Sequence, residues 1–573
     1  PSMSATDILR ARIAHEWQYQ LEHCPTFASM LGDRRWNDRW DDRRLSAIDE
    51  DHQHSLDVLA ELRALDRDAL SAEDRLNYDL IRRDYQTWVE EYEFKLHLLP
   101  TNQLGGVPEG VRQPPFIQSA YQLTEHLRFQ TVKDYEDWLA RLERFADYAS
   151  QIVALMREGI RERRVHPRIV LERIPPQIDR QLVDDPEKSG FYGPFKGFPA
   201  HISDADRQRL SAGARKAISE GVLPALRRFR EFLAAEYIPA APEPVGIWQF
   251  PSGEETYAYL ARRFTTTSTT PEQIHALGIS EVARIRAEME TVKAKTAFSG
   301  SLHEFFDFLR NDARFYYRTG EELLLHYRSL AKRVDPLLVK LFKTLPRQPY
   351  GVEPTPDELA PDVPGAFYYA AAADGSRPGT FLVNLYLPET RPRWEMIPLT
   401  LHEAVPGHHL QTSLAAELTH IPEFRRFAYH VAYGEGWALY CETLGDELGL
   451  YDDPYDKFGQ LVLDMWRAVR LVVDTGMHAK RWTRQQAIDY FAENTPRSKL
   501  DIANEVDRYI VWPGQALGYK VGQLKIRELR TRAERALGER FDVRAFHDLV
   551  LLDGSLPLEI LEQRVDAWIR PQM

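Results

Sequence analysis

Long stretches of amphipathic helical periodicity constrain this chain more than any other feature of its sequence. Residues 71 to 99 begin with a serine cap and then carry apolar residues at intervals of three and four, which places them on one face of a helix. Residues 132 to 164 show the same pattern over a longer span, and Thr270 followed by Pro271 is a typical helix start. Helices of this length must pack together to bury their apolar faces. The sequence therefore predicts one large, mostly α-helical body.

Two segments depart from this pattern. Residues 174 to 201 are rich in Pro and Gly, which predicts a loop that crosses the surface. Within residues 346 to 391, two runs of aromatic and β-branched residues flank the turn sequence DGSRPG, which predicts a β-hairpin. An exposed strand edge can hold an extended peptide through main-chain hydrogen bonds. A hairpin at this point of the chain therefore favours peptide binding.

The charge distribution argues against nucleic acid or a membrane as partners. The formal net charge is −13, from 86 acidic and 73 basic residues that are spread along the chain rather than collected in blocks. Residues 33 to 44 alternate Arg with Asp, which is typical of a solvated surface. No segment resembles a basic nucleic-acid-binding face, and no apolar run approaches the ~18 residues that a membrane-spanning helix needs.

Cysteine usage favours a cytoplasmic protein. Cys24 and Cys441 are the two cysteines, too few for a disulfide framework, and two buried free thiols suit a reducing compartment. The given chain shows no secretory signal peptide. A processed periplasmic or secreted form is the alternative, and the sequence leaves the oligomeric state open.

The segment PLTLHEAVPGHHLQTSL, residues 398 to 414, nearly contains the H-E-x-x-H helix of zinc proteases. A catalytic zinc uses three protein ligands, commonly two His and one carboxylate, and keeps a fourth position for water. A glutamate beside the first histidine can take the proton of that water as it attacks a carbonyl. His402 and Glu403 supply this ligand and this base.

The second histidine arrives later than in that helix. On a regular α-helix, His408 lies about 600° around the axis and ~9 Å along it from His402, and His409 lies about 700° and ~10 Å away, so neither can share a metal with it. Pro406 has no N–H for the carbonyl of residue 402, and Gly407 adds backbone freedom. These two residues can break the turn and bring a later histidine to the metal.

The third ligand should come from another helix. Residues 433 to 449 carry Glu435 and Glu442, which are seven residues apart and therefore on nearly the same helix face. Both can point into one cleft, one as a metal ligand and the other orienting a histidine. The spacing alone does not choose between them.

Four segments in this order, HEAVPGHHLQ, EGWALYCE, RLVVDTGMHAKRW and PGQALGYKVG, resemble the bacterial proteins grouped as domain of unknown function 885. The resemblance is most specific in the C-terminal half and extends more loosely over the whole chain. The same segments are distantly similar to α-helical zinc peptidases, namely Taq-type carboxypeptidases, angiotensin-converting enzyme and the thimet oligopeptidase group.

The resemblance to these zinc peptidases implies a ligand set. Taq-type enzymes have H-E-A-G-H, and a two-residue insertion before its Gly aligns His402, Glu403 and His408 with that motif. Glu435 follows His408 by 27 residues and matches the position of their glutamate ligand better than Glu442, which follows it by 34. The ligands implied for one Zn²⁺ per chain are His402, His408 and Glu435, with His409 and Glu442 as alternates.

The resemblance also implies residues that face the substrate. Residues 507 to 520 are similar to the segment in which these peptidases place an Arg and a Tyr toward the substrate. Arg508 would then hold a substrate carboxylate, and Tyr509 would donate to the oxyanion formed on attack. Tyr519 is the competing donor, and His478 is a further candidate for the same cleft.

Together with the resemblance, the sequence predicts a single zinc-peptidase-like domain over residues 1 to 573, with a mainly helical part at 1–345 and a part at 346–573 that holds the hairpin and the active-site helices. We expect a bilobed α-helical body with a deep central cleft and the hairpin or a small sheet at its rim. The expected activity is zinc-dependent hydrolysis of peptide bonds in short peptides, by an oligopeptidase or a carboxypeptidase. The alternatives are a metal-dependent hydrolase of a non-peptide amide or ester, and a catalytically inactive peptide-binding protein.

Overall fold

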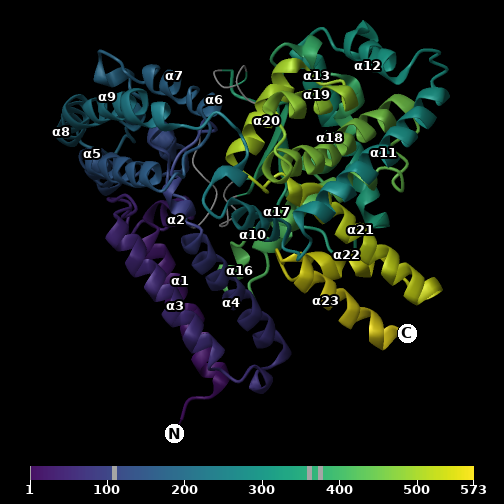
Figure 1. The fold of residues 1–573 in the computed structure, drawn as a ribbon, viewed down its shortest axis with the longest axis horizontal. Coiled ribbons are helices and arrows are strands. Elements are labelled where there is room, and N and C mark those ends of the chain that lie inside the picture. Colours follow the sequence, from purple (N-terminus) through teal and green to yellow (C-terminus); the bar gives the residue numbers. More distant parts are fainter. Residues whose placement is uncertain (1, 106–111, 358–359, 361–363, 372–377) are drawn as a thin grey trace. The chain divides into compact units, whose positions relative to one another are not determined.

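The computed structural model describes residues 2–105, 112–357, 360, 364–371 and 378–573. The chain divides into two compact units, one formed by Pro1–Val245 with Gln249–Gly253 and the other by Gly246–Trp248 with Glu254–Met573. Both units are mostly α-helical, as the sequence predicts (Figure 1). Across the described residues, every helix is too short or too polar to span a membrane.

The first unit is built around α5 (Val132–Arg161), which is the long helix predicted from residue 132 onward. Thr131 caps its N-terminus and Asp134 returns the hydrogen bond, so both ends of the capping pair are satisfied. α8 (Asp204–Ala217) and α9 (Leu223–Phe232) pack against α5. The other helices of this unit are α1 (Ala5–His23), α2 (Pro25–Met30), α3 (Leu45–Arg63), α4 (Ala72–Glu93), α6 (Arg168–Leu171), α7 (Ile174–Asp179), α8 (Asp204–Ala217) and α9 (Leu223–Phe232).

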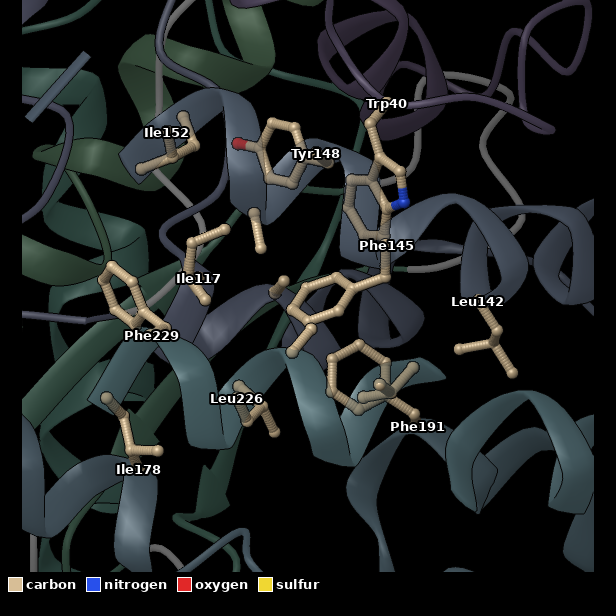
Figure 2. Close-up of a cluster of buried hydrophobic side chains, with 14 of the residues drawn as sticks. Trp40, Ile117, Leu142, Phe145, Tyr148, Ile152, Ile178, Phe191, Leu226 and Phe229 are labelled. Atoms are coloured by element: carbon tan, nitrogen blue, oxygen red, sulfur yellow. The ribbon is translucent and has the colours of Figure 1, made fainter. Parts of the chain in front are cut away.

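Aromatic and aliphatic side chains pack together in the core of the first unit (Figure 2). Trp40 stacks on Tyr148 with ring centroids 5.2 Å apart, and its indole N–H donates to the carbonyl of Arg141 at 2.8 Å. Phe145 meets Phe191 edge to face at 5.2 Å. Because buried aromatic rings contribute large apolar areas, the first unit has a hydrophobic core of its own.

The predicted surface loop at 174 to 201 is only partly a loop. It begins with α7 and contains a 3-10 helix at Gly190–Lys196, whose Phe191 and Phe195 are buried. Pro and Gly do break the helical pattern here. However, aromatic residues between them gain more free energy in the core than on the surface, so the segment folds inward.

The second unit is organised around α18 (Pro454–Ala479), which lies along α11 (Pro271–Lys295) (Figure 1). α11 begins at the predicted Thr270 cap. A Cβ on Gly278 of α11 would lie 2.8 Å from the side chain of Leu471, so glycine allows this close approach. The helices of this unit are α10 (Gly253–Thr265), α11 (Pro271–Lys295), α12 (Leu302–Asn311), α13 (Gly320–Val334), α14 (Met396–Glu403), α15 (His408–Ala416), α16 (Glu423–Arg426), α17 (Val431–Thr443), α18 (Pro454–Ala479), α19 (Arg484–Asn494), α20 (Lys499–Val511), α21 (Leu517–Leu537), α22 (Val543–Leu551) and α23 (Leu558–Ile569).

The boundary between the units lies near residue 250, whereas the sequence predicts a change of character after residue 345. The difference arises because α11, α12 and α13 pack with the C-terminal helices and the sheet rather than with the helices before them. The elements that position the candidate site therefore include this earlier stretch of chain.

Three short strands form a mixed sheet in the second unit, in the order β1-β3-β2. β2 (Ala366–Tyr369) and β3 (Gly379–Val383) pair antiparallel, which confirms the predicted hairpin pairing. Most of the turn sequence DGSRPG lies outside the described residues. β1 (Tyr350–Pro354) joins β3 in parallel, a pairing that the hairpin pattern does not predict.

Two glycines set the crossing of α17 and α21. A Cβ on Gly522 would lie 1.9 Å from the carbonyl oxygen of Ala432, and a Cβ on Gly436 would lie 2.6 Å from the backbone of Gly522. No side chain fits at either position, so the helices touch backbone to backbone. Because Glu435 directly precedes Gly436, this crossing fixes the place of Glu435 in the unit.

Candidate metal centre

The segment that carries the candidate histidines forms two helices rather than one. α14 ends at Glu403 and α15 begins at His408, so the helix break expected from the Pro-Gly sequence is present. Residues 404 to 407 form the junction between the two helices. The carbonyl of Pro406 accepts a hydrogen bond from Nε1 of Trp437 at 2.9 Å, which ties the junction to α17.

Gly407 is the residue that this junction requires. A Cβ at this position would lie 2.0 Å from the carbonyl oxygen of His402 and 2.4 Å from that of Leu401. Every other amino acid would clash there with the end of α14. After the junction, the N–H of His409 donates to the carbonyl of Ala404 at 3.0 Å, so backbone hydrogen bonding resumes directly.

Side chains from three helices converge at the junction. Oε2 of Glu435 on α17 lies 3.3 Å from Nε2 of His402 on α14 and 3.3 Å from Nε2 of His408 on α15. The two imidazole rings stand at 85° to one another with centroids 4.7 Å apart. Oε1 of Glu403 lies 4.0 Å from Nε2 of His402. In the described part of the chain, His402, Glu403 and His408 are the group of His, Cys and acidic residues whose ligand atoms lie within 4.8 Å of one another.

The separations between the Glu435 oxygen and the two histidine nitrogens match those of a tetrahedral zinc site. Zinc binds imidazole nitrogen and carboxylate oxygen at about 2.0–2.2 Å, and a tetrahedron of that radius has edges of about 3.3–3.6 Å. The two separations of 3.3 Å from Glu435 to the histidines lie in this range. Two imidazoles and one carboxylate are also a donor set of catalytic zinc sites. The residues present therefore fit the ion that the sequence predicts.

A buried ion pair orients His402 from behind. Its Nδ1 lies 2.9 Å from Oε2 of Glu442, whose side chain is fully buried. A carboxylate only accepts hydrogen bonds, so Nδ1 holds a proton and Nε2 is the nitrogen left to face Glu435. Nη1 of Arg467 on α18 lies 3.5 Å from the same oxygen of Glu442 and compensates its buried charge.

The carboxylates make this group attractive to a cation. Burial alone lowers the pKa of His402, but hydrogen bonds to Glu435 and Glu442 outweigh it and raise the pKa to about 10. Burial raises the pKa of Glu435, but His408 and His402 overcome it, so this pKa lies well below its ordinary value. A proton on His402 thus supplies positive charge that the carboxylates attract, and a divalent cation can replace that proton.

The structure turns His409 away from this group. Its Nε2 lies 2.8 Å from the carbonyl oxygen of Gln348, and its Nδ1 lies 2.7 Å from the hydroxyl of Tyr368 on β2. A Cβ on Gly379 of β3 would lie 2.5 Å from the same ring, so the sheet packs directly on it. The two neighbouring histidines therefore have different contacts. His408 faces His402, whereas His409 is hydrogen-bonded to Tyr368 of the sheet and to Gln348.

Arg508, Tyr509 and Tyr519 form a second cluster, on α20 and α21. Nη2 of Arg508 donates to the hydroxyl of Tyr519 at 3.0 Å, and the hydroxyl of Tyr509 donates to Glu505 at 2.6 Å. Arg470 of α18 donates to the hydroxyl of Tyr509 at 2.9 Å and to Glu505 at 3.0 Å. Burial keeps the pKa of Tyr509 well above its ordinary value. The hydroxyl of Tyr509 is therefore engaged inside an ion pair.

α18 contacts both the second cluster and Glu442, which adjoins the candidate metal group of His402, His408 and Glu435. Arg467, which faces Glu442, and Arg470, which faces Glu505, are three residues apart and so lie one turn apart, ~4.5 Å along the helix. Nη1 of Arg470 and Nε of Arg508 are buried and have no hydrogen-bond partner among the described residues. Such guanidinium donors can bind an anionic group of a ligand.

His478 connects two backbone segments through hydrogen bonds. Its Nδ1 accepts a hydrogen bond from the backbone N–H of Ile247 at 3.0 Å, and its Nε2 donates to the carbonyl of Tyr509 at 2.9 Å. Burial lowers the pKa of His478 to about 4, so the ring is neutral at pH 7. Both ring nitrogens are engaged with the backbone, which leaves neither for a substrate.

The sequence reasoning missed two residues that contact the candidate metal group or its neighbour Glu442. The hydroxyl of Tyr429 donates to Oε1 of Glu435 at 3.2 Å, and Arg467 pairs with Glu442. No spacing rule singles out Tyr429, which lies outside the helices. Arg467 could have been found from the sequence, because it lies in the apolar run DMWRAVRLVV. An arginine is rarely buried without a partner, so this position predicts a buried acidic residue nearby.

Two solved structures share this fold. A protein from Colwellia psychrerythraea, described as a candidate lipoprotein, is 28% identical, aligns over 100% of this chain and 100% of its own, and has a TM-score of 0.89. A protein from Shewanella oneidensis, described as a candidate lipoprotein of unknown function, is 18% identical, aligns over 98% of this chain and 99% of its own, and has a TM-score of 0.74. The second likeness shows the fold alone.

The sequence also matches one family model. That model is described as a bacterial protein of unknown function (DUF885), and it covers residues 25–565. No curated protein matches the sequence. Because the family model spans nearly the whole chain, including most of both units and the candidate metal group, this chain belongs to the DUF885 family.

Proposed function

We propose that this protein is a zinc-dependent hydrolase that cleaves peptide bonds in short peptides. The observation that carries the proposal is the convergence of His402, His408 and Glu435, with Oε2 of the glutamate 3.3 Å from each histidine. Glu403 places a second carboxylate 4.0 Å from the first of these histidines. A zinc donor set, a tetrahedral separation and an adjacent base are the parts that a hydrolytic zinc site needs.

Each residue of the group has its own task in this proposal. A zinc ion bound there would polarise the substrate carbonyl and make water more acidic. Glu403 would take the proton from the attacking water and pass it to the leaving nitrogen. Glu442 would keep a proton on Nδ1 of His402, so that Nε2 stays the ligand atom. Arg467 would compensate the buried charge of Glu442.

The second cluster supplies the contacts to the substrate. The unpaired donors of Arg470 and Arg508 would bind a carboxylate of the peptide. Tyr519 suits the role of oxyanion donor better than Tyr509. The hydroxyl of Tyr519 accepts from Arg508 and keeps its own proton to donate, whereas the hydroxyl of Tyr509 donates to Glu505.

The cell envelope is the proposed compartment. Both solved relatives are described as candidate lipoproteins, and the more similar of the two matches this chain along its whole length. The descriptions of these relatives favour the envelope, whereas cysteine usage alone favours the cytoplasm. Peptides that reach or leave the cell surface would then be the substrates.

Metal content is the first test of the proposal. We expect about one zinc per chain by elemental analysis of the purified protein, and little zinc in His402→Ala, because a site with two of its three ligands binds the ion poorly. His420→Ala is the control, since His420 is exposed and lies outside the group. A wild-type chain without metal, even after zinc is supplied, would contradict the proposal and favour a peptide-binding protein.

Turnover then separates the base from the ligands. Glu403→Gln should retain zinc and lose about 10²–10⁴-fold in hydrolysis, because an amide cannot take the proton of water. Zinc-loaded Glu403→Gln with wild-type hydrolysis would refute the role of Glu403. A panel of short peptides, non-peptide amides and esters identifies the bond that is cut. Activity on esters or non-peptide amides alone would replace the peptide assignment.

A further inference from the structure

The two oxygens of Glu435 have different partners. Oε2 lies 3.3 Å from Nε2 of His402 and 3.3 Å from Nε2 of His408. Oε1 accepts a hydrogen bond from the hydroxyl of Tyr429 at 3.2 Å. Tyr429 is 48% exposed, whereas the side chain of Glu435 is 16% exposed, so the hydroxyl reaches the carboxylate from the solvent side.

Packing holds the ring of Tyr429 in this place. The next residue, His430, occupies the N-cap position of α17, and its backbone N–H donates to the hydroxyl of Ser555 at 3.0 Å. Gly434, directly before Glu435, makes room for the ring, because a Cβ there would lie 2.6 Å from a ring carbon of Tyr429. The ring therefore lies against the first turn of α17, and its hydroxyl is preset toward Glu435.

We infer that Tyr429 is a positioning residue that makes Glu435 meet the metal through Oε2 alone. The inference rests on the proposed function, since it assumes that the group binds zinc. With Oε1 held by the hydroxyl, the carboxylate presents one oxygen and the fourth position of the metal stays open for water. Without the hydroxyl, the carboxylate is free to turn and bring both oxygens to the metal, which closes that position.

Tyr429→Phe isolates the hydroxyl. This variant keeps the ring and its packing on Gly434 and removes one hydrogen bond to Glu435. Tyr386→Phe is the matched control, because Tyr386 is exposed to a similar extent, 44%, and lies outside the group. Both variants should unfold at the same temperature as the wild type, so a change in metal binding reports on the site and not on folding.

Two measurements on the purified proteins test the inference without relying on activity. In competition with a chelator, we expect Tyr429→Phe to bind zinc about 10–100-fold more weakly than the wild type. With Co²⁺ in place of zinc, we expect weaker visible absorption, because cobalt with five or more ligands absorbs less than tetrahedral cobalt. Tyr386→Phe should match the wild type in both measurements.

The outcomes separate this inference from the proposed function. A Tyr429→Phe protein with wild-type zinc affinity and a wild-type cobalt spectrum would overturn the inference alone. Weaker zinc binding with an unchanged cobalt spectrum would overturn it as well, because that result indicates general loosening and not a second oxygen on the metal. A wild-type chain that binds neither ion would overturn the proposed function, and the inference with it.

Discussion

At the scale of single residues, the buried histidines of the second unit are of two kinds. His402 lies among carboxylates, which outweigh burial and raise its pKa to about 10. His478 and His547 each contact a backbone carbonyl and no carboxylate, and burial lowers their pKa values to about 4 and about 3, with Arg530 and Arg527 adding to the shift of His547. Electrostatic surroundings thus decide which histidine attracts a cation and which one must stay neutral in the folded chain.

The pH dependence of stability should reveal the second kind. Above pH 6.5, His478 is neutral in the folded and the unfolded chain, and its contribution to stability is complete. As pH falls from about 6.5 to about 4, the unfolded chain binds a proton that the folded chain does not, so the free energy of unfolding falls. A pKa difference of this size corresponds to about 3 kcal/mol. Urea unfolding at pH 7.5, 6 and 5 measures the slope.

His478→Gln should show a shallower loss of stability over this pH range than the wild type, because glutamine does not titrate. His420→Gln is the control, since an exposed histidine has nearly the same surroundings in both states. Parallel pH profiles for the wild type and His478→Gln would show that this histidine is not held neutral by the fold.

Residue types and local spacing predict part of the candidate site, namely the residues that share one helix or one helix face. The His-Glu pair and the seven-residue interval between Glu435 and Glu442 follow from helix periodicity, so the sequence could place them. The different contacts of His408 and His409 depend on the turn at 404 to 407. Pro406 and Gly407 predict that the helix breaks there, but they do not predict the backbone conformation of the turn. Contacts such as that of Tyr429 with Glu435 depend on tertiary packing and leave no periodic signal.

At the scale of elements, the long helices were predictable because their signals are local. α4, α5 and α11 begin at Ser, Thr and Thr caps that precede periodic apolar residues. The β2–β3 hairpin is local as well. β1 was not predicted, because a parallel pairing joins residues that are distant in sequence and its five residues show no alternating pattern. The aromatic residues at 191 and 195 likewise fold inward for tertiary reasons.

The crossing of α17 and α21 makes a prediction at this scale. Gly522→Ala places a methyl group where 1.9 Å separates it from the carbonyl oxygen of Ala432, so the helices must move apart. We expect the free energy of unfolding to fall by about 1–3 kcal/mol. Zinc affinity should fall with it, because α17 carries Glu435. Urea unfolding and chelator competition measure the two effects.

Gly221→Ala is the matched control for this variant. Its Cβ would have no neighbour closer than the carbonyl oxygen of Leu142 at 4.0 Å, and alanine suits a helical position better than glycine. We expect Gly221→Ala to be neutral or slightly stabilising and to leave zinc binding unchanged. Wild-type stability and zinc affinity in Gly522→Ala would mean that the glycine contact does not set the position of α17.

At the scale of the whole molecule, the similarity to a solved structure extends over both compact units. The relative from Colwellia psychrerythraea aligns over 100% of both chains with a TM-score of 0.89, so its match is not confined to the unit that holds the candidate site. Each unit has its own buried core. The bilobed shape and the deep central cleft expected from the resemblance to zinc peptidases stay predictions.

The proposed compartment is a prediction for the whole chain. If the protein acts in the envelope, as we propose, the native protein expressed in its own cells should appear in the membrane or periplasmic fraction. Immunoblotting of fractionated cells, with a cytoplasmic enzyme as marker, measures this. Recovery of the protein together with the cytoplasmic marker would contradict the envelope assignment and leave the proposed chemistry untouched.

The break between α14 and α15 has a mechanical consequence. Because the helix is interrupted, the proposed ligands His402, His408 and Glu435 come from three helices, and the first and last of them are 33 residues apart in sequence. A bound cation would then act as a reversible cross-link between residues 402, 408 and 435, and it would oppose the unfolding of the chain segments between them. Residues 404 to 407, which join α14 to α15, would then be less mobile when the metal is bound than when it is absent.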